Sequence, residues 1–198
     1  MMENFWDQRY AADEYAYGIK PNVYFRDVMG QLNPGKLLLP GEGEGRNAVF
    51  AASLGWQVTA FDYSSEARRK AQLLAARRGV SVDYRVESYD EVQFSPDAFD
   101  ALAFIFTHMP LGNRSFYHQK LLRYLAPGGV LILEGFSKAQ IDYRTGGPSN
   151  PDMLFSREEL AADFASLSEL SITEAEIDIN EGRFHQGKAA VIRVLGFK

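Results

Sequence analysis

The chain contains no cysteine among its 198 residues. This absence excludes disulfide bonds, thiolate ligands for a metal and a cysteine nucleophile. Long apolar runs are also missing, because the longest, residues 101–106, falls far short of the roughly 20 apolar residues that a membrane-spanning helix needs. The N-terminus shows no basic segment followed by an apolar core. We therefore expect no secretory signal, no membrane association and a cytoplasmic location.

Basic residues are outnumbered, with 21 Lys and Arg against 26 Asp and Glu. A protein that binds nucleic acid through its phosphates usually carries a basic patch. The one dense basic cluster is Arg68-Arg69-Lys70 with Arg77-Arg78, and we interpret it as the solvated face of an amphipathic helix. We therefore expect a small-molecule partner rather than nucleic acid.

Hydrophobic residues make up 46% of the chain, which excludes a disordered tail protein.

Strand-like and helix-like segments alternate between about residues 36 and 137, a pattern typical of parallel strands joined by crossover helices. The short connection 181–187 predicts a final antiparallel hairpin. We expect a doubly wound, Rossmann-like α/β sheet of seven strands, mostly parallel with the last strand antiparallel, with helices on both faces and one domain spanning 1–198. The expected strands are 36–39, 57–61, 82–86, 100–106, 130–134, 172–179 and 189–197, and the expected helices are 46–54, 64–78, 113–125 and one opening at 156.

The first strand is followed by a glycine loop, Gly41-Glu42-Gly43-Glu44-Gly45. Such a loop lets backbone approach a ligand without a Cβ in the way. The dinucleotide fingerprint G-x-G-x-x-G is not met, because Arg46 stands where the third glycine would be, and no Walker lysine follows. Like charges about 4 Å apart repel by roughly 4 kcal/mol at an effective dielectric of 20, so the two glutamates disfavour a pyrophosphate.

Asp62 ends the second strand, where an acid can accept hydrogen bonds from ribose hydroxyls. A ribose combined with a positive charge indicates S-adenosylmethionine, whose sulfonium and ammonium groups are both cationic. A nicotinamide-dependent oxidoreductase is the alternative, since it would use Asp62 in the same way but would place a pyrophosphate beside Glu42 and Glu44.

With these features the sequence resembles class I S-adenosylmethionine-dependent methyltransferases, and within them the tellurite-resistance and thiopurine methyltransferase-like group. The resemblance spans about residues 5–198. The segments that carry it are 41–47, Asp62, Phe99-Asp100 leading into 105–110, 125–129 and 181–187.

The resemblance implies how S-adenosylmethionine would be held. Backbone at Gly41 and Gly43 would abut the methionine part, Asp62 would hold the ribose, and backbone near Phe106 would meet the ammonium group. The segment 6–22, within an N-terminal lid of about residues 1–30, would cover the cofactor. The full set of cofactor-binding residues implied is Gly41, Glu42, Gly43, Asp62, Tyr63, Ser88, Tyr89, Phe106 and Tyr17.

Two positions depart from the pattern of the class. Leu39 stands where an acid often precedes the first glycine by two positions, and Ser88 stands where an aspartate often lies beside adenine. Each departure removes a polar contact, for which Glu42 or Glu87 could compensate. A protein that keeps the fold and binds the cofactor without turnover is therefore a further alternative.

Methyl transfer from a sulfonium is a one-step displacement, so we expect neither a metal site nor a catalytic triad. Three candidates for contact with the acceptor are His108, Arg183 and His185. His108 is either a base or a loop histidine bonded to backbone. Arg183 and His185 form either an anion-recognition pair or a polar turn. The loop 138–155 is either a substrate-side flap or a loose connection, and the sequence leaves a monomer and a homodimer equally open.

Overall fold

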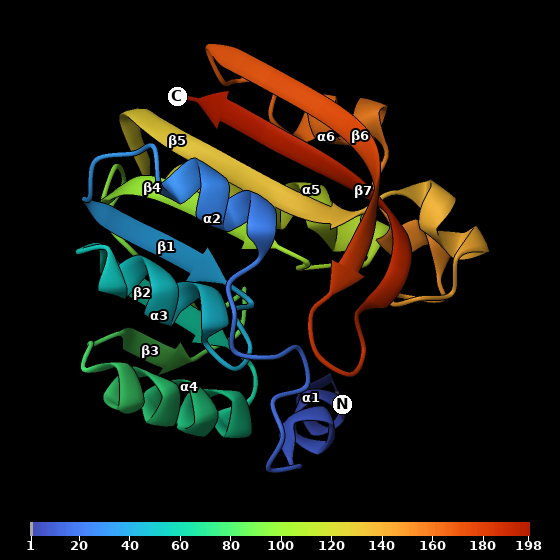
Figure 1. The fold of residues 1–198 in the computed structure, drawn as a ribbon. Helices are drawn as coiled ribbons and strands as arrows, with labels where there is room; N and C mark the ends of the chain where they lie inside the picture. Colours follow the sequence, from blue (N-terminus) through green and yellow to red (C-terminus); the bar gives the residue numbers. More distant parts are fainter. Residues whose placement is uncertain (1) are drawn as a thin grey trace. The chain divides into compact units, whose positions relative to one another are not determined.

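The computed structural model describes residues 2–198, with side chains from Phe5 onward. Seven strands form one mixed sheet in the order β3-β2-β1-β4-β5-β7-β6 (Figure 1). This confirms the predicted α/β fold with parallel strands followed by an antiparallel hairpin. The chain divides into two compact units, Met1–Gln93 with Glu181–Phe184 and Phe94–Asn180 with His185–Lys198. The expectation of a single methyltransferase domain stays a prediction.

The first unit contains the three parallel strands that precede residue 93. Leu37 pairs with Val58, and Phe61 pairs with Arg85. Helix α3 packs against both α2 and α4, and α1 packs against α4 (Figure 1). The elements of the first unit are α1 (Met2–Tyr10), α2 (Val23–Met29), β1 (Lys36–Pro40), α3 (Arg46–Ser53), β2 (Gln57–Asp62), α4 (Ser65–Arg78) and β3 (Asp83–Val86).

The ends of α4 follow from local chemistry. The Ser64 side chain accepts the backbone N–H of Ala67 at 3.1 Å, and Gly79 ends the helix with a left-handed φ of 65°. These are the expected N-cap and C-terminal glycine of a helix. Because β2 runs directly into this cap, Asp62 is fixed at the carboxyl end of its strand.

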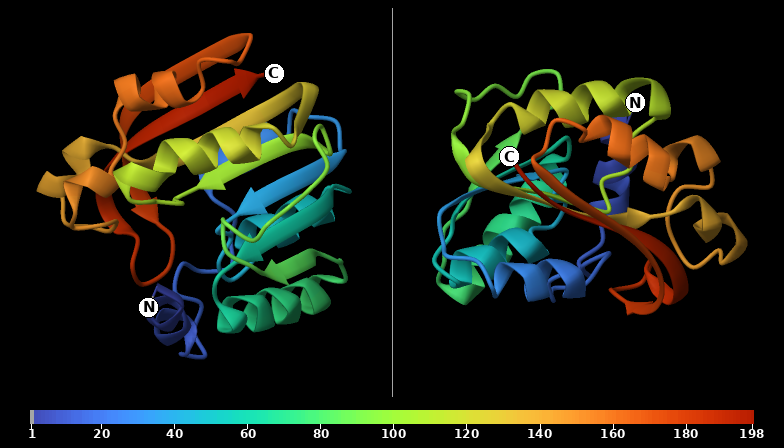
Figure 2. Two further views of the ribbon diagram at one scale, coloured as in Figure 1. Left: turned by 180° about the vertical axis from the view of Figure 1, so that it is seen from behind. Right: turned by 90° about the horizontal axis from the view of Figure 1, so that it is seen from above.

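The second unit contains the parallel pair β4–β5 and the antiparallel strands β7 and β6. Both β5 and β6 pair antiparallel with β7, so they run in the same direction. Helices α5 and α6 lie on the same face of these strands (Figure 2). Its elements are β4 (Phe99–Ile105), α5 (Leu111–Leu122), β5 (Leu125–Phe136), the 3₁₀ turns η1 (Lys138–Asp142) and η2 (Pro151–Met153), α6 (Arg157–Asp163), β6 (Glu169–Asn180) and β7 (Gln186–Phe197).

Most boundaries lie within a few residues of the sequence-based expectation, and two segments differ in kind. The segment 125–129 was expected to end a helix, but it opens β5: Leu125 pairs with Phe99, after which the register shifts. Gly128, with a φ of 76°, and Gly129 exchange backbone hydrogen bonds with Lys198 at 2.7 and 3.0 Å. A bulge rich in glycine therefore lengthens the strand where a turn was expected. The segment 138–155 contains the turns η1 and η2, and whether it is a substrate-side flap or a loose connection stays open.

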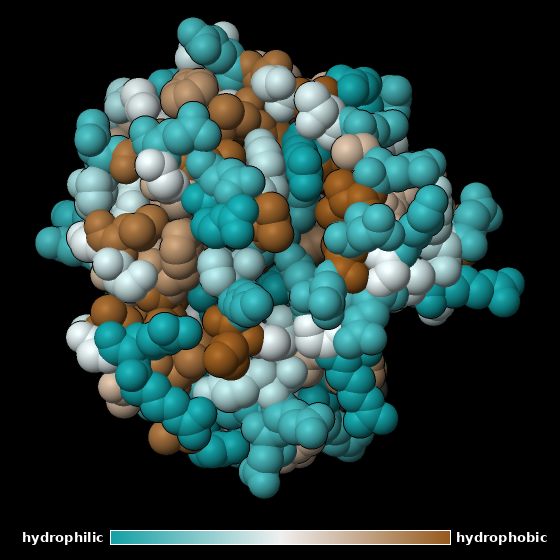
Figure 3. Space-filling model, viewed as in Figure 1, coloured by the Kyte–Doolittle hydropathy of each residue, from teal (hydrophilic) through white to brown (hydrophobic). Residues whose placement is uncertain are grey.

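The exposed surface is mainly polar, with apolar side chains scattered among hydrophilic ones on the face drawn in Figure 3. Exposed large apolar residues include Val23 and Phe116. Within residues 2–198 we find no helix with the length and apolar character needed to cross a membrane.

Candidate cofactor site and acceptor-side residues

The glycine loop between β1 and α3 depends on backbone conformations that favour glycine. Gly41, Gly43 and Gly45 have φ values of 58°, 63° and 86°. A Cβ on Gly45 would lie 2.5 Å from the Cβ of Ala71 on α4, so this glycine also allows the loop to approach that helix. The Tyr84 hydroxyl donates a hydrogen bond to the Gly43 carbonyl at 2.5 Å. The loop is therefore held from β3 as well as from its own strand.

Asp62 lies under this loop at the end of β2 and is 6% exposed. Its Oδ2 accepts the Gly43 N–H and its Oδ1 accepts the Ser64 N–H, both at 3.0 Å. Burial raises the pKa of Asp62 to about 6, against the opposing effect of these backbone hydrogen bonds. The carboxyl group is therefore mainly ionised at neutral pH and keeps acceptor capacity beyond two N–H groups.

Glu42 holds the start of α3. Its Oε1 accepts the backbone N–H groups of Asn47 and Ala48, both at 2.8 Å, so it caps the first turn of α3. Burial raises the pKa of this carboxyl to about 7, opposed by the hydrogen bonds that it accepts. Glu42 therefore has a structural role at the helix N-terminus, and its contact with the cofactor stays a prediction.

Glu44 forms a buried ion pair with Lys70 of α4. The Lys70 Nζ lies 2.5 Å from Glu44 Oε1, and both side chains are 3% exposed. The other carboxylate oxygen accepts the Ala16 N–H at 2.7 Å. The prediction that both glutamates disfavour a pyrophosphate is therefore wrong for Glu44, since its charge is balanced by Lys70.

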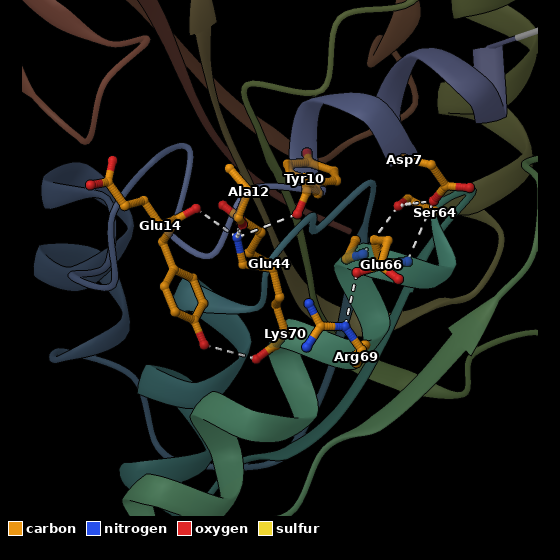
Figure 4. A network of polar contacts seen from close by, with 11 residues as sticks. Asp7, Tyr10, Ala12, Glu14, Glu44, Ser64, Glu66, Arg69 and Lys70 are labelled. Carbon is orange, nitrogen blue, oxygen red and sulfur yellow. Dashed lines mark hydrogen bonds and ion pairs between the residues drawn. The ribbon is translucent and has the colours of Figure 1, made fainter.

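Lys70 also ties the N-terminal segment to α4. Its ammonium group donates to the carbonyl oxygens of Ala12 at 2.7 Å and Glu14 at 2.6 Å, with Tyr10 at 3.5 Å. Figure 4 shows this nitrogen among the three carbonyls, whereas Arg69 on the same helix turns to Glu66. Interpreting Lys70 as part of a solvated basic face was wrong. The charge pattern of the sequence could not show that Lys70 is buried, because the neighbouring basic residues Arg68 and Arg69 are exposed.

Arg46 and Asn47, which follow the glycine loop, hold the same N-terminal segment. Arg46 pairs with Glu181 at 2.8 Å and donates to the Tyr17 carbonyl at 3.2 Å. Asn47 Oδ1 accepts the Asn22 N–H at 2.9 Å. The resemblance to methyltransferases included these residues in its motif without giving them a role, and the structure shows that they anchor residues 17–22.

Aromatic side chains gather beside Asp62, at the ends of β2 and β3. Tyr89 is buried and packs edge-on against Phe61, with ring centroids 5.2 Å apart, and its ring centroid lies 6.0 Å from that of Tyr63. Ser88 accepts the Glu91 N–H and donates its own N–H to the Glu91 carboxylate, so it makes a local turn. The structure thus brings Asp62, Tyr63 and Tyr89 together with the glycine loop.

Tyr10 and Tyr17 connect the N-terminal segment with this loop. A Cβ on Gly43 would lie 2.8 Å from the Tyr10 hydroxyl, so α1 approaches the glycine loop closely. Tyr17 accepts a hydrogen bond from Arg9 at 3.3 Å, and its ring lies 6.5 Å from that of Tyr10. These contacts agree with a covering segment, and Tyr17 belongs to the first unit with every other candidate cofactor residue except Phe106.

In the second unit, Phe106 follows β4 with a φ of 54°. Left-handed backbone is unusual for a bulky residue and is found preferentially where surrounding structure enforces it. Here the Phe106 N–H donates to the Glu134 carbonyl at 2.7 Å, and the Phe106 carbonyl accepts the His108 N–H at 3.2 Å. The backbone after β4 is therefore held in a defined turn.

His108 is bonded to backbone through both ring nitrogens. Nδ1 lies 2.8 Å from the Met153 carbonyl oxygen, and Nε2 accepts the Phe136 N–H at 3.1 Å. The ring stacks between Phe136 and Phe155. Burial lowers the pKa of His108 to about 4. The proposal that His108 acts as a base is therefore corrected, since neither nitrogen is available to an acceptor.

His185 and Arg183 lie in different units, and each has its own surroundings. His185 is 5% exposed, and its ring packs against Phe106 and Phe136 at 4.7 and 5.1 Å. Arg183 is exposed, and its guanidinium carbon lies 5.7 Å from the Phe184 ring centroid. Among residues 2–198 no cluster of three or more His, Asp or Glu is arranged to hold a metal ion.

Comparison with known proteins identifies a domain in the part of the chain that contains the glycine loop and Asp62. Residues 38–133 match a methyltransferase domain. The match begins in β1 and ends in β5, and so includes the glycine loop, Asp62, Tyr63, Ser88, Tyr89 and Phe106. A methyltransferase domain of this type implies S-adenosylmethionine as cofactor, and the buried acid, its aromatic neighbours and the glycine loop fit the ribose, base and chain of such a nucleoside.

A curated relative and two solved structures agree with this domain. A ubiquinone biosynthesis O-methyltransferase from Xanthomonas euvesicatoria pv. vesicatoria is 32% identical over 111 residues, which cover 54% of this chain and 46% of that protein. The chain thus matches about half the length of that relative. A SAM-dependent methyltransferase from Methanosarcina mazei superposes with a TM-score of 0.71 at 20% identity, over 90% of this chain and 98% of that one. TehB from Haemophilus influenzae gives 0.69 at 15% identity, over 99% and 66%. At these identities the two structures show the fold alone.

The titration of His108 predicts a loss of stability in acid. Burial lowers the pKa of His108 in the folded protein from 6.5 to about 4. Between these two pH values the imidazole is therefore protonated in the unfolded chain but mainly neutral in the folded protein. Stability is therefore complete above pH 6.5 and declines as the pH falls towards 4, by about 2–3 kcal/mol for this group. Urea unfolding of the wild type and of His108→Gln at pH 7 and 4.5 measures the change in the free energy of unfolding between the two pH values. Glutamine is chosen because it keeps a donor and an acceptor but does not titrate. Equal pH dependence of the two proteins would contradict it.

Proposed function

We propose that the chain is an S-adenosylmethionine-dependent methyltransferase that acts on a small-molecule acceptor. The observation that carries the proposal is the coincidence of the methyltransferase-domain match over 38–133 with a glycine loop whose central N–H is held by the buried carboxylate of Asp62. When bound, the cofactor supplies an electrophilic methyl group, which the acceptor's nucleophile takes as the bond to sulfur breaks.

The residues of this chain would then bind and orient. Backbone at Gly41 and Gly43 would contact the methionine part, Asp62 would accept from the ribose hydroxyls, and Phe106 backbone would meet the ammonium group. Adenine would lie beside the side chains of Tyr63, Ser88 and Tyr89, with Tyr17 in the covering segment. Correct alignment of nucleophile and methyl group can lower a barrier by about 7–11 kcal/mol without a base. This suits a site in which both nitrogens of His108 are occupied.

We further propose that the protein belongs with the tellurite-resistance and thiopurine methyltransferase-like group. Support comes from the anchoring of residues 10–22 on the glycine loop and α4, which gives this chain the covering segment expected from that resemblance. Arg183 and His185 stay candidates for contact with the acceptor. A cytoplasmic location, the absence of nucleic-acid binding, and a monomeric or dimeric state stay predictions.

Calorimetric titration with adenosylhomocysteine, and separately with NADH, tests the cofactor class. We expect saturable binding of adenosylhomocysteine at one site per chain and none of NADH. Binding of NADH without adenosylhomocysteine would overturn the proposal in favour of the oxidoreductase. Binding of adenosylhomocysteine without methyl transfer to a broad panel of acceptors would favour a non-catalytic binding protein.

A further inference from the structure

A cavity of about 310 Å³ lies between α1 and the segment 181–184, within the first unit. Its wall includes two arginines, Arg9 and Arg183, two phenylalanines, Phe5 and Phe184, and one acid, Glu14. The cofactor-binding residues proposed above are not among those that line it. The cavity therefore presents a separate surface with apolar rings and a positive balance of charge.

Arg9 is held over aromatic faces rather than by a carboxylate. Its guanidinium carbon lies 4.0 Å from the Phe184 ring centroid and 5.1 Å from that of Phe5. One N–H donates to the Tyr17 hydroxyl at 3.3 Å. Among the described side chains no carboxylate lies within ion-pair distance of Arg9, so most of its five N–H donors are available to a ligand.

Arg183 approaches the same ring from a fixed segment. Its guanidinium carbon is 5.7 Å from the Phe184 centroid, and its backbone N–H donates to the Ala16 carbonyl at 3.0 Å. A Cβ on the preceding Gly182 would lie 2.5 Å from that carbonyl, so the approach of the two segments is close. Arg183, too, has no ion-pair partner within the part of the chain that the structure describes.

Three other arginines of the chain differ from this arrangement because each is paired with an acid. Arg46, Arg114 and Arg193 each lie within 3.0 Å of a carboxylate oxygen, whereas Arg9 and Arg183 share one cavity and one aromatic ring. In a protein with a net charge of −5, two guanidinium groups that line one cavity without an ion-pair partner among the described side chains can recognise a planar oxyanion through their N–H donors.

We propose that the cavity binds the carboxylate of an aromatic acid, with Arg9 and Arg183 as specificity-determining residues and Phe5 and Phe184 as the apolar surface for its ring. Glu14, whose backbone carbonyl is bound by Lys70, contributes the single negative charge of the wall and disfavours a second carboxylate on the ligand.

Equilibrium titration with benzoate, followed by ligand-observed NMR, tests the proposal. We expect saturable binding to the wild type, a dissociation constant raised at least about tenfold in Arg9→Gln/Arg183→Gln, and tighter binding in Glu14→Gln. Arg68→Gln removes one positive charge from an exposed position of α4 and should leave benzoate binding unchanged. Benzylamine, which has the ring without the carboxylate, should not bind.

Equal binding of benzoate by the wild type and the double variant would overturn the proposal, as would equal loss in Arg68→Gln or no saturable binding at all. Titration of the same proteins with adenosylhomocysteine separates this outcome from failure of the proposed function. We expect Arg183→Gln, which leaves the hydrogen bond from Arg9 to Tyr17 intact, to bind adenosylhomocysteine as the wild type does. If adenosylhomocysteine binds while benzoate does not, the cavity assignment alone fails. If benzoate binds and adenosylhomocysteine does not, the cavity assignment stands and the proposed function fails.

Discussion

Replacement of Lys70 by methionine is expected to destabilise the protein by about 3–5 kcal/mol, because it leaves the buried Glu44 carboxylate without its counter-charge. Burial already raises the pKa of Glu44, and the hydrogen bond and positive charge of Lys70 oppose that effect. The substitution also removes the donors that hold the carbonyls of Ala12 and Glu14. Urea unfolding at neutral pH measures the loss.

Arg69→Met is the matched control, since Arg69 lies next to Lys70 and makes only an exposed pair with Glu66. We expect a change below about 1 kcal/mol for this control. Adding Glu44→Gln to Lys70→Met should restore part of the stability, because no unpaired charge then stays buried. Equal loss in the two single variants, or no recovery in the double variant, would contradict a buried ion pair at this position.

The same substitution should expose the N-terminal segment to proteolysis under native conditions. Lys70 is the donor that joins residues 10–14 to α4, whereas Arg46 and Asn47 hold residues 17–22. Cleavage between residues 10 and 16 should therefore accelerate in Lys70→Met before the rest of the chain is cut. In Arg69→Met the pattern of cleavage should match the wild type.

Substitution of Asp62 by asparagine is expected to weaken adenosylhomocysteine binding by about 10- to 150-fold, the equivalent of about 1.5–3 kcal/mol for hydrogen bonds to a charged group. Asparagine keeps the size of the side chain and one oxygen acceptor, so the glycine loop retains support. Calorimetric titration gives the two dissociation constants. Asp178→Asn, on the exposed face of β6, removes the same charge and should have no effect.

A ligand without the ribose 2′-hydroxyl separates direct contact from an indirect effect through the loop. If Asp62 accepts from that hydroxyl, the 2′-deoxy analogue should bind the wild type more weakly and lose little further affinity in Asp62→Asn. If the losses of affinity caused by the 2′-deoxy ligand and by Asp62→Asn were additive, a direct contact between Asp62 and the 2′-hydroxyl would be contradicted. Affinity in the wild type should also fall as the pH drops through about 6, the pKa of Asp62, because the protonated acid has less acceptor capacity.

The fold could be predicted from the sequence because strong local signals agreed along the chain. Leu37–Leu39 is an apolar run ending at Pro40-Gly41, Ser64 and Gly79 bound α4, and Ser156 with Glu159 forms the capping box of α6. Each signal is local and does not depend on contacts between distant residues. The strand at 125–129 was missed because Pro127 and two glycines ordinarily indicate a turn, whereas here they lie in a bulge that pairs with the C-terminal strand.

The position of Asp62 could be predicted for the same reason, since it depends only on where β2 ends. The roles of Glu42, Glu44 and His108 could not, because they depend on partners distant in sequence or on the direction of a side chain. Glu44 meets Lys70, and His108 meets the backbone of Met153 and Phe136. A motif places such residues near a site, but only the three-dimensional arrangement shows whether their polar atoms are already bound.

A crystal structure of the complex with adenosylhomocysteine tests the central claim most directly. The account predicts a ribose hydroxyl within hydrogen-bonding distance of the Asp62 carboxylate, with the homocysteine part against the backbone of Gly41 and Gly43. Adenosylhomocysteine bound elsewhere, or a glycine loop that stays without ligand at saturating adenosylhomocysteine, would contradict it.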